Sequence, residues 1–229
     1  MPTKLKNEEI LKWDIVTWEA ALIYWERELP NNLNGFRALE LGSSCGGLSA
    51  WLAQKGAEVI ASDIAPLQDE ANALHKRYNL AIRIRHQIVD ATMIPYENEF
   101  DIIIFKSIVG RIGSNNNICR QRILFEQIHK ALKPSGKLLF AENKKSSPLH
   151  QWARKKFMKW GESWSYITHS DMKFFLRHYN KFNLVSGGFI SPIGRSKSQR
   201  NFLGYVDRHF LNHIVPKSWH YIIYGIAQK

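Results

Sequence analysis

The segment ALELGSSCGG, residues 38–47, combines residue types and spacing that can bind a small ligand. An apolar run leads to Glu40, a turn rich in glycine and serine follows, and residues 48–54 then have the composition of a helix. Such a strand–loop–helix unit lets backbone N–H groups approach a ligand closely. Because Glu40 stands two residues before Gly42, the ligand is expected to carry positive charge or hydroxyl groups, not only phosphate.

The glycine spacing separates two kinds of nucleotide ligand. A dinucleotide-binding loop, G-x-G-x-x-G, needs its middle glycine so that the backbone can approach the pyrophosphate. Aligned in that way, the chain offers Gly42, Ser44 and Gly47, and the Ser44 side chain would crowd a pyrophosphate. This counts against NAD. S-adenosylmethionine is one ligand that carries both a positive charge and hydroxyls. A turn of this kind can also serve packing alone.

Two further acids follow the next apolar runs. Asp63 comes directly after residues 59–62, where a carboxylate can accept hydrogen bonds from both hydroxyls of a ribose. Asp90 follows an expected strand at 82–88 and can accept a hydrogen bond from an adenine amino group. Either aspartate could instead cap a helix. Three acids in this order and spacing favour a single nucleoside site.

These acids need a sheet whose strands end at a common edge. Apolar runs and turn residues predict strands at 36–41, 58–62, 82–88, 101–105, 137–141, 182–190 and 220–227. Helices are expected at 8–29, 48–55, 68–78, 117–132 and 170–179. Strands that alternate with helices predict right-handed βαβ units and an α/β, doubly wound sheet.

In these motifs the chain resembles the class I S-adenosylmethionine-dependent methyltransferases. The resemblance covers residues 36–143 by motif and extends to the C-terminus by strand pattern. It implies a Rossmann-like methyltransferase fold, with a mostly parallel seven-stranded sheet and an antiparallel final strand. It also implies a transferase that uses S-adenosylmethionine for methylation and releases S-adenosylhomocysteine.

The resemblance assigns a cofactor site residue by residue. Glu40 and the loop 42–47 would hold the methionine end, Asp63 the ribose, and Asp90 the adenine. The full expected set is Glu40, Gly42, Ser43, Ser44, Gly46, Gly47, Asp63, Ile64, Asp90, Ala91 and Lys106. The chain departs from the family at Ser44, where a glycine is usual, and at residues 106–111, which lack the paired histidines of many relatives.

Methyl transfer asks little of the protein beyond positioning and desolvation, although a general base helps when the nucleophile is protonated. Two residues are candidate bases: Glu142, which closes the fifth expected strand, and His169, near the start of a helix. Glu142 could instead cap an element or pair with Lys144, and His169 could serve as a cap. The nine histidines are scattered without a metal-binding motif, so no metal is expected.

The length of 229 residues fits one methyltransferase domain, 1–229. We expect the helix 8–29 and the insertions 144–168 and 191–219 to form a lid at the acceptor site. The candidate substrate contacts in and around these segments are Trp18, Arg111, Lys144, Trp164 and Tyr166. Aromatic residues could equally serve core packing alone.

The net charge of +12 is unevenly distributed along the chain. Residues 1–110 hold 11 Lys and Arg against 15 Asp and Glu, whereas residues 111–229 hold 21 against 5. A basic half of this kind fits an acidic acceptor, nucleic acid or an anionic membrane surface, and also a merely solubilising surface.

Three functions therefore compete. The first is methylation of a small-molecule or glycan/lipid-linked, acidic acceptor; the second is methylation of RNA or another nucleic acid; the third is a non-catalytic cofactor-binding scaffold. With two cysteines, no signal-type segment and no apolar run long enough to span a membrane, a cytoplasmic protein is expected, with peripheral membrane contact still open. The acceptor atom and the oligomeric state stay open.

Overall fold

The computed structural model describes residues 4–66, 69–157 and 164–229. In this part of the chain, seven strands form one sheet in the order β3-β2-β1-β4-β5-β7-β6. Strands β1 to β5 are parallel, and β7 runs antiparallel to β5 and β6. The strands are β1 Arg37–Leu41, β2 Glu58–Asp63, β3 Ile84–Ile88, β4 Phe100–Lys106, β5 Leu132–Asn143, β6 Lys181–Gly187 and β7 Ile222–Gln228. The predicted mostly parallel sheet with an antiparallel final strand is confirmed.

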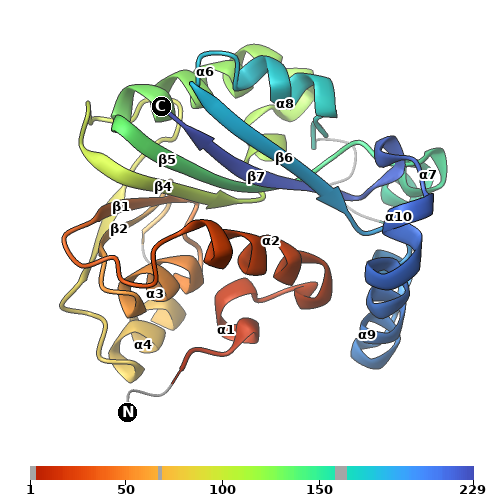
Figure 1. Cartoon of the computed structure of the whole chain (residues 1–229), viewed down its shortest axis with the longest axis horizontal. Helices are drawn as coiled ribbons and strands as arrows, with labels where there is room; N and C mark the ends of the chain where they lie inside the picture. The colour runs from red at the N-terminus through yellow and green to blue at the C-terminus, as the bar shows by residue number, and fades with distance from the viewer. Residues whose placement is uncertain (1–3, 67–68, 158–163) are drawn as a thin grey trace.

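Helices cover both faces of the sheet (Figure 1). They are α1 Asn7–Leu11, α2 Ile15–Glu28, α3 Gly47–Gln54, α4 Asp69–Arg77, α5 Val109–Ile112, α6 Ile118–Ala131, α7 Pro148–Phe157, α8 His169–Phe175, α9 Lys197–Val206 and α10 Asn212–Ile214. Apolar residues of α1 to α4 form the core on one face, and those of α6 and α8 form the core on the other.

The central strand β4 shows why the sheet is buried on both sides. Ile102 and Ile104 belong to one core, whereas Ile103 and Phe105 belong to the other. Successive side chains of a strand point to opposite faces, so a strand covered on both faces must be apolar throughout. The carboxyl ends of the parallel strands therefore carry the polar groups available for a site.

The expected helix 8–29 is two helices, because the backbone turns sharply at residues 12–14. Lys12 and Asp14 both have positive φ, of 65° and 45°. The Asp14 side chain accepts a hydrogen bond from Thr17 Oγ1 at 3.0 Å, and the Trp13 ring meets the Trp18 ring edge to face at 5.2 Å. The break thus folds Trp13 back against α2, which a continuous helix would not allow.

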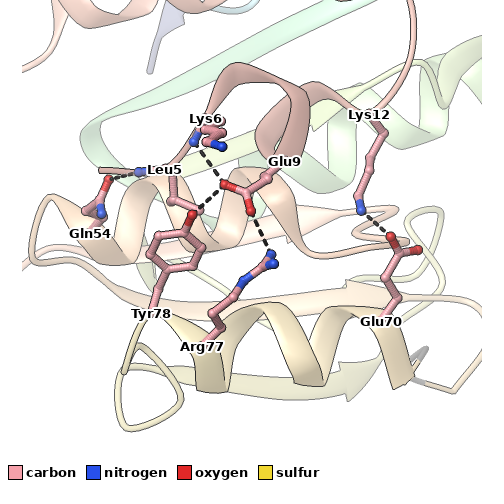
Figure 2. A network of polar contacts seen from close by, with 8 residues as sticks. All are labelled: Leu5, Lys6, Glu9, Lys12, Gln54, Glu70, Arg77 and Tyr78. Carbon is pink, nitrogen blue, oxygen red and sulfur yellow. Dashed lines mark hydrogen bonds and ion pairs between the residues drawn. The ribbon is translucent and has the colours of Figure 1, made fainter. Parts of the chain in front are cut away.

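A set of polar contacts ties α1 to α3 and α4 (Figure 2). The Glu9 carboxylate accepts hydrogen bonds from the Lys6 backbone N–H at 3.0 Å and the Tyr78 hydroxyl at 2.6 Å, and it pairs with Arg77 at 2.6 Å. Lys12 forms an ion pair with Glu70. We call these the α1 contacts. They hold the N-terminal segment over the start of α3.

In their described residues, the insertion 144–168 contains α7 and the insertion 191–219 contains α9 and α10. Both lie beyond the arrowhead of β6, at the edge where the parallel strands end (Figure 1). The buried Asp207 carboxylate fixes the second insertion by accepting hydrogen bonds from the backbone N–H groups of residues 189, 190 and 191. Residues 158–163 of the first insertion lie outside the described residues. Among those described, no helix is long and apolar enough to cross a membrane.

Candidate active site

Glu40 lies buried near the end of β1, against the first turns of α3. Its Oε2 accepts hydrogen bonds from the Ser49 backbone N–H at 2.8 Å and from the Ser49 hydroxyl. Burial raises the pKa of Glu40 to about 7, although the bonds from Ser49 oppose that rise. A cation placed beside this carboxyl would favour its ionised form.

The glycine loop is held in a left-handed conformation. Gly42, Ser44 and Gly46 have φ of 70°, 46° and 69°. A Cβ on Gly42 would lie 2.6 Å from Ile108 Cγ2, so this position needs glycine for both backbone conformation and space. Ser44 tolerates positive φ because its backbone N–H donates to Asp63 Oδ2 at 3.0 Å. The serine that departs from the family pattern is thereby accommodated.

A pocket of about 240 Å³ lies between this loop and the ends of β2 and β3. Ser43, Ser44 and Asp63 line it, as expected for the cofactor site, together with His86 and Gln87 of β3. The two β3 residues were not predicted. Polar residues inside the expected strand 82–88 were the available signal, because a strand end that faces a ligand need not be apolar.

Two isoleucines stand exposed around this pocket. Ile64, predicted as a cofactor contact, is 69% exposed, and Ile88, which lines the pocket, is 62% exposed. Exposed aliphatic side chains at the ends of adjacent strands suit the faces of a planar base. Ile88, like the other β3 residues, was absent from the expected set.

Asp90 forms a turn with Thr92. Its Oδ1 accepts hydrogen bonds from the Thr92 backbone N–H at 2.8 Å and from the Thr92 hydroxyl at 2.7 Å, and these bonds lower the pKa of Asp90. In the described part of the chain no hydrogen bond reaches Oδ2. Asp90 therefore stabilises a turn and caps no helix, and it keeps one oxygen for a ligand beside Ala91.

Lys106, one of the expected cofactor contacts, contributes its side chain to the site. Its Nζ lies 4.1 Å from the Trp13 ring centroid and 4.9 Å from that of Trp18. Burial lowers the pKa of Lys106 to about 8, and the charges of Glu142, Asp14 and Glu40 oppose that fall. The predicted substrate contact Trp18 is itself fully buried beneath this amine.

Glu142 is the last residue but one of β5 and is fully buried. It accepts hydrogen bonds from the backbone N–H groups of Val109 at 2.7 Å and Asn143 at 2.8 Å, which fixes the start of α5. Burial raises its pKa to about 7. The alternative pairing with Lys144 is wrong, because Lys144 Nζ donates to the carbonyl oxygens of Lys217 and Ser218. The capping role is the one observed.

His169, the second candidate base, begins α8 but does not cap it. Thr168 is the N-cap, and it exchanges hydrogen bonds with Asp171 in a capping box. Nδ1 of His169 is buried without a hydrogen-bond partner, and burial lowers its pKa. In the described residues no group of three or more His, Cys, Asp or Glu side chains could hold a metal ion.

The remaining expected acceptor contacts fall in two places. Arg111 and Trp164 line a hollow of about 710 Å³ together with Arg120, near the start of α6. Lys144 and Tyr166 lie elsewhere, around Arg154, whose guanidinium carbon is 3.9 Å from the Tyr166 ring centroid. Arg120 and Arg154 were not among the predicted contacts, although their basic character in the second half of the chain was a signal.

The comparisons with known proteins agree with this fold. The family model described as "Methyltransferase domain" matches residues 32–197, which is most of the chain, and the chain therefore belongs to this family. No curated protein matches it in sequence.

Solved structures similar to the chain share its fold at low identity. One is phosphoethanolamine N-methyltransferase 2 of Haemonchus contortus in complex with phosphomonomethylethanolamine and S-adenosylhomocysteine, with TM-score 0.64, 18% identity and 93% of this chain covered. The match covers 52% of that enzyme, so the chain spans about half its length. Another is a putative methyltransferase of Bacillus halodurans, with TM-score 0.62, 14% identity and coverage of 92% of this chain and 99% of that one.

A third match is the complex of the Haloferax volcanii methyltransferase activator Trm112 with a putative methyltransferase. It has TM-score 0.65 and 14% identity, and covers 97% of this chain and 92% of that one. At these identities the likeness carries the fold, and the chemistry must be argued from the residues of the site.

Proposed function

We propose that the protein is an S-adenosylmethionine-dependent methyltransferase that acts on a small-molecule or glycan/lipid-linked, acidic acceptor. The observation that carries the proposal is the placement of Glu40, Asp63 and Asp90 on three neighbouring strand ends around the glycine loop. Asp63 would bind the ribose, the pocket between Ile64 and Ile88 the adenine, and Glu40 the cationic methionine end.

When bound, the cofactor supplies an electrophilic sulfonium methyl group, which an oxygen, nitrogen, sulfur or carbon nucleophile attacks in line. The chain positions donor and acceptor and excludes water. Glu142 fixes α5 beside the end of β4 through Val109. We propose Lys106, whose pKa is lowered, as the base that accepts a proton from a protonated nucleophile. The nearby Glu142 and Asp14 carboxylates would stabilise the resulting ammonium charge.

Two findings support an acidic acceptor. The second half of the chain carries the whole basic excess, and its insertions lie at the edge where the site is built. The similar Haemonchus contortus structure holds phosphomonomethylethanolamine, a small phosphate-bearing molecule. A phosphate or carboxylate on the acceptor would meet arginine and lysine side chains there.

A nucleic-acid acceptor is the second candidate, favoured by exposed aromatic residues beside basic ones on α7 and α9. Trp152, Phe202 and Tyr205 are each more than half exposed. Aromatic rings and cations of this kind stack on bases and neutralise phosphates. RNA binding that weakens steeply with salt would favour this candidate over a small acceptor. A non-catalytic scaffold is the third candidate function, and detection of labelled-methyl transfer would exclude it.

The deciding experiment is calorimetric titration with S-adenosylmethionine, S-adenosylhomocysteine and NAD, followed by a labelled-methyl transfer screen. The screen covers small phosphate and carboxylate metabolites, lipid-linked sugars and RNA. We expect both sulfur nucleosides to bind and a small acidic acceptor to be methylated. Binding of NAD in place of the sulfur nucleosides would overturn the proposal.

A further inference from the structure

Arg154 on α7 is a buried cation without a counter-charge in the described part of the chain. The residue is 3% exposed, and no described carboxylate forms an ion pair with it. Its Nη1 donates to the Lys144 carbonyl oxygen at 2.8 Å, whereas Nη2 is buried with no hydrogen-bond partner. Buried charges in proteins are normally paired, because desolvating a charge is costly. Among the described residues, Nη2 is therefore a donor that an anionic ligand could satisfy.

Two tyrosines hold the guanidinium in a fixed plane. The guanidinium carbon lies 3.9 Å from the Tyr166 ring centroid and 4.6 Å from that of Tyr221. Rings around a guanidinium stabilise the cation through their faces and leave its N–H groups at the edge for hydrogen bonding. Arg154 is thus oriented before any ligand arrives.

Two further polar groups near the start of α7 are also unpartnered. Ser146 Oγ and His150 Nε2 are buried without hydrogen-bond partners. Ser146 precedes α7 and lies in the chain between Lys144, whose carbonyl binds Arg154, and Ser147, which contacts His150. Ser147 Oγ lies 2.7 Å from His150 Nδ1. If this hydroxyl donates, Nε2 carries the proton and becomes a donor.

This cluster faces the edge at which the chemistry is proposed. The carbonyl that Arg154 binds belongs to Lys144, two residues after Glu142. Tyr166 is close enough to Glu142, and Tyr221 to Asp14, for the acids to act on the pKa of each tyrosine. The cluster and Lys106 therefore share Glu142 and Asp14 as neighbours.

We propose that Arg154, His150 and Ser146 bind a phosphate monoester group of the acceptor. Three donors, Nη2, Nε2 and Oγ, match the three terminal oxygens of a phosphate monoester better than the two of a carboxylate. This assignment deepens the proposed function and rests on it for the identity of the bound molecule as acceptor. Because Nη2 is buried without ligand, binding requires a shift of α7.

The test measures anion binding on the full chain without cofactor. Thermal unfolding is followed in inorganic phosphate, acetate and chloride at equal ionic strength, for wild type, Arg154→Gln and Arg177→Gln. Arg177 is the matched control, since it also stacks on a ring, Phe174, and donates to a backbone carbonyl, yet is exposed. We expect phosphate to raise the Tm of wild type and Arg177→Gln above its value in chloride, and Arg154→Gln to lose at least tenfold in phosphate affinity.

Equal stabilisation of Arg154→Gln by phosphate would overturn the site, as would no phosphate effect on wild type. A larger effect of acetate would overturn the phosphate assignment in favour of a carboxylate. Hydrogen exchange of residues 148–157 gives a second readout. Phosphate should change the exchange of these residues in wild type and leave it unchanged in Arg154→Gln. The cofactor titration is independent: absent S-adenosylmethionine binding with intact phosphate binding would sink the proposed function and leave the anion site standing.

Discussion

Glu40 and Asp63 lie near the ends of β1 and β2, Asp90 lies two residues beyond β3, and the environments of the three carboxylates differ. Glu40 is buried against Ser49, Asp63 is partly exposed and holds the Ser44 backbone, and Asp90 binds Thr92. Burial raises the pKa of Glu40 to about 7, whereas the hydrogen bonds from Thr92 outweigh burial and lower the pKa of Asp90. Glu40 and Asp90 should therefore respond differently to pH.

Asp63→Ala should weaken binding of S-adenosylmethionine strongly, because it removes the acceptor for the ribose hydroxyls and releases the Ser44 N–H. Loss of a charged hydrogen-bond partner costs about 1–3 kcal/mol, roughly a 5- to 150-fold higher Kd. Calorimetry measures the change. Glu58→Gln, at the exposed start of the same strand, is the control and should bind like wild type. An unchanged Kd for Asp63→Ala would remove the ribose assignment.

Glu40 should release a proton when a cationic cofactor binds beside it. With a folded pKa of about 7 against the usual 4.5, the carboxyl is mostly protonated at pH 6 and ionised above pH 8. Calorimetry in buffers of different ionisation enthalpy should show release near pH 6 that vanishes above pH 8, and Glu40→Gln should abolish it. The raised pKa also lowers the free energy of unfolding progressively from pH 4.5 to about 7.

Lys106→Met should remove the alkaline-side rise of the methyl-transfer rate. The folded pKa of about 8 lies below the usual 10.5, so the neutral amine, which can accept a proton, accumulates as the pH rises through 8. Wild type should gain rate over that interval, and the variant should not. Lys76→Met, on the exposed side of α4, serves as the control. A retained rise in Lys106→Met would exclude the amine as the base.

At the scale of elements, α1 packs directly on the start of α3. A Cβ on Gly47 would lie 2.3 Å from the Ile10 carbonyl oxygen and 2.5 Å from that of Glu9. Only glycine lets the two backbones approach so closely. The glycine is therefore required by the neighbouring helix and not by its own backbone conformation.

Gly47→Ala should displace α1 and raise hydrogen exchange at residues 7–11, with weaker cofactor binding as Trp13 moves. Gly187→Ala is the matched control, because a Cβ there meets only the Asn212 side chain, at 3.3 Å, and φ is not in the left-handed region. Exchange measured by mass spectrometry should separate the two variants. Identical exchange in both would show that α1 adapts to the extra methyl group.

The sequence predicted the strands well because local apolar runs define them. The run 101–105 can only be a buried strand, and β1 separates it from β2, the strand that Asp63 ends. The break at residues 12–14 rests on the nearby Thr17 and Trp18. The environments of the Lys106 side chain and of Arg154, which has no counter-charge among the described residues, depend on residues distant in sequence. Trp13, Trp18 and Tyr221 create those environments, and their proximity has no local signature.

Across the whole molecule, acidic and basic residues are concentrated in different halves of the chain. The proposed cofactor site is built from the acidic first half, whereas the insertions at the acceptor edge come from the basic second half. Complementary fields of this kind favour a cationic donor and an anionic acceptor meeting at the ends of β4 and β5. The two halves meet in one sheet through the β4–β5 pairing, so neither site can form alone.

The α1 contacts have a kinetic consequence. They are surface ion pairs and hydrogen bonds, such as Lys12–Glu70 and Glu9–Arg77, and salt weakens such pairs. If spent S-adenosylhomocysteine leaves only when α1 lifts, added salt should shorten its residence time, and turnover limited by its departure should quicken. Stopped-flow measurement of its dissociation across ionic strengths tests this, with Glu9→Gln and Glu70→Gln expected to give the fast rate already at low salt.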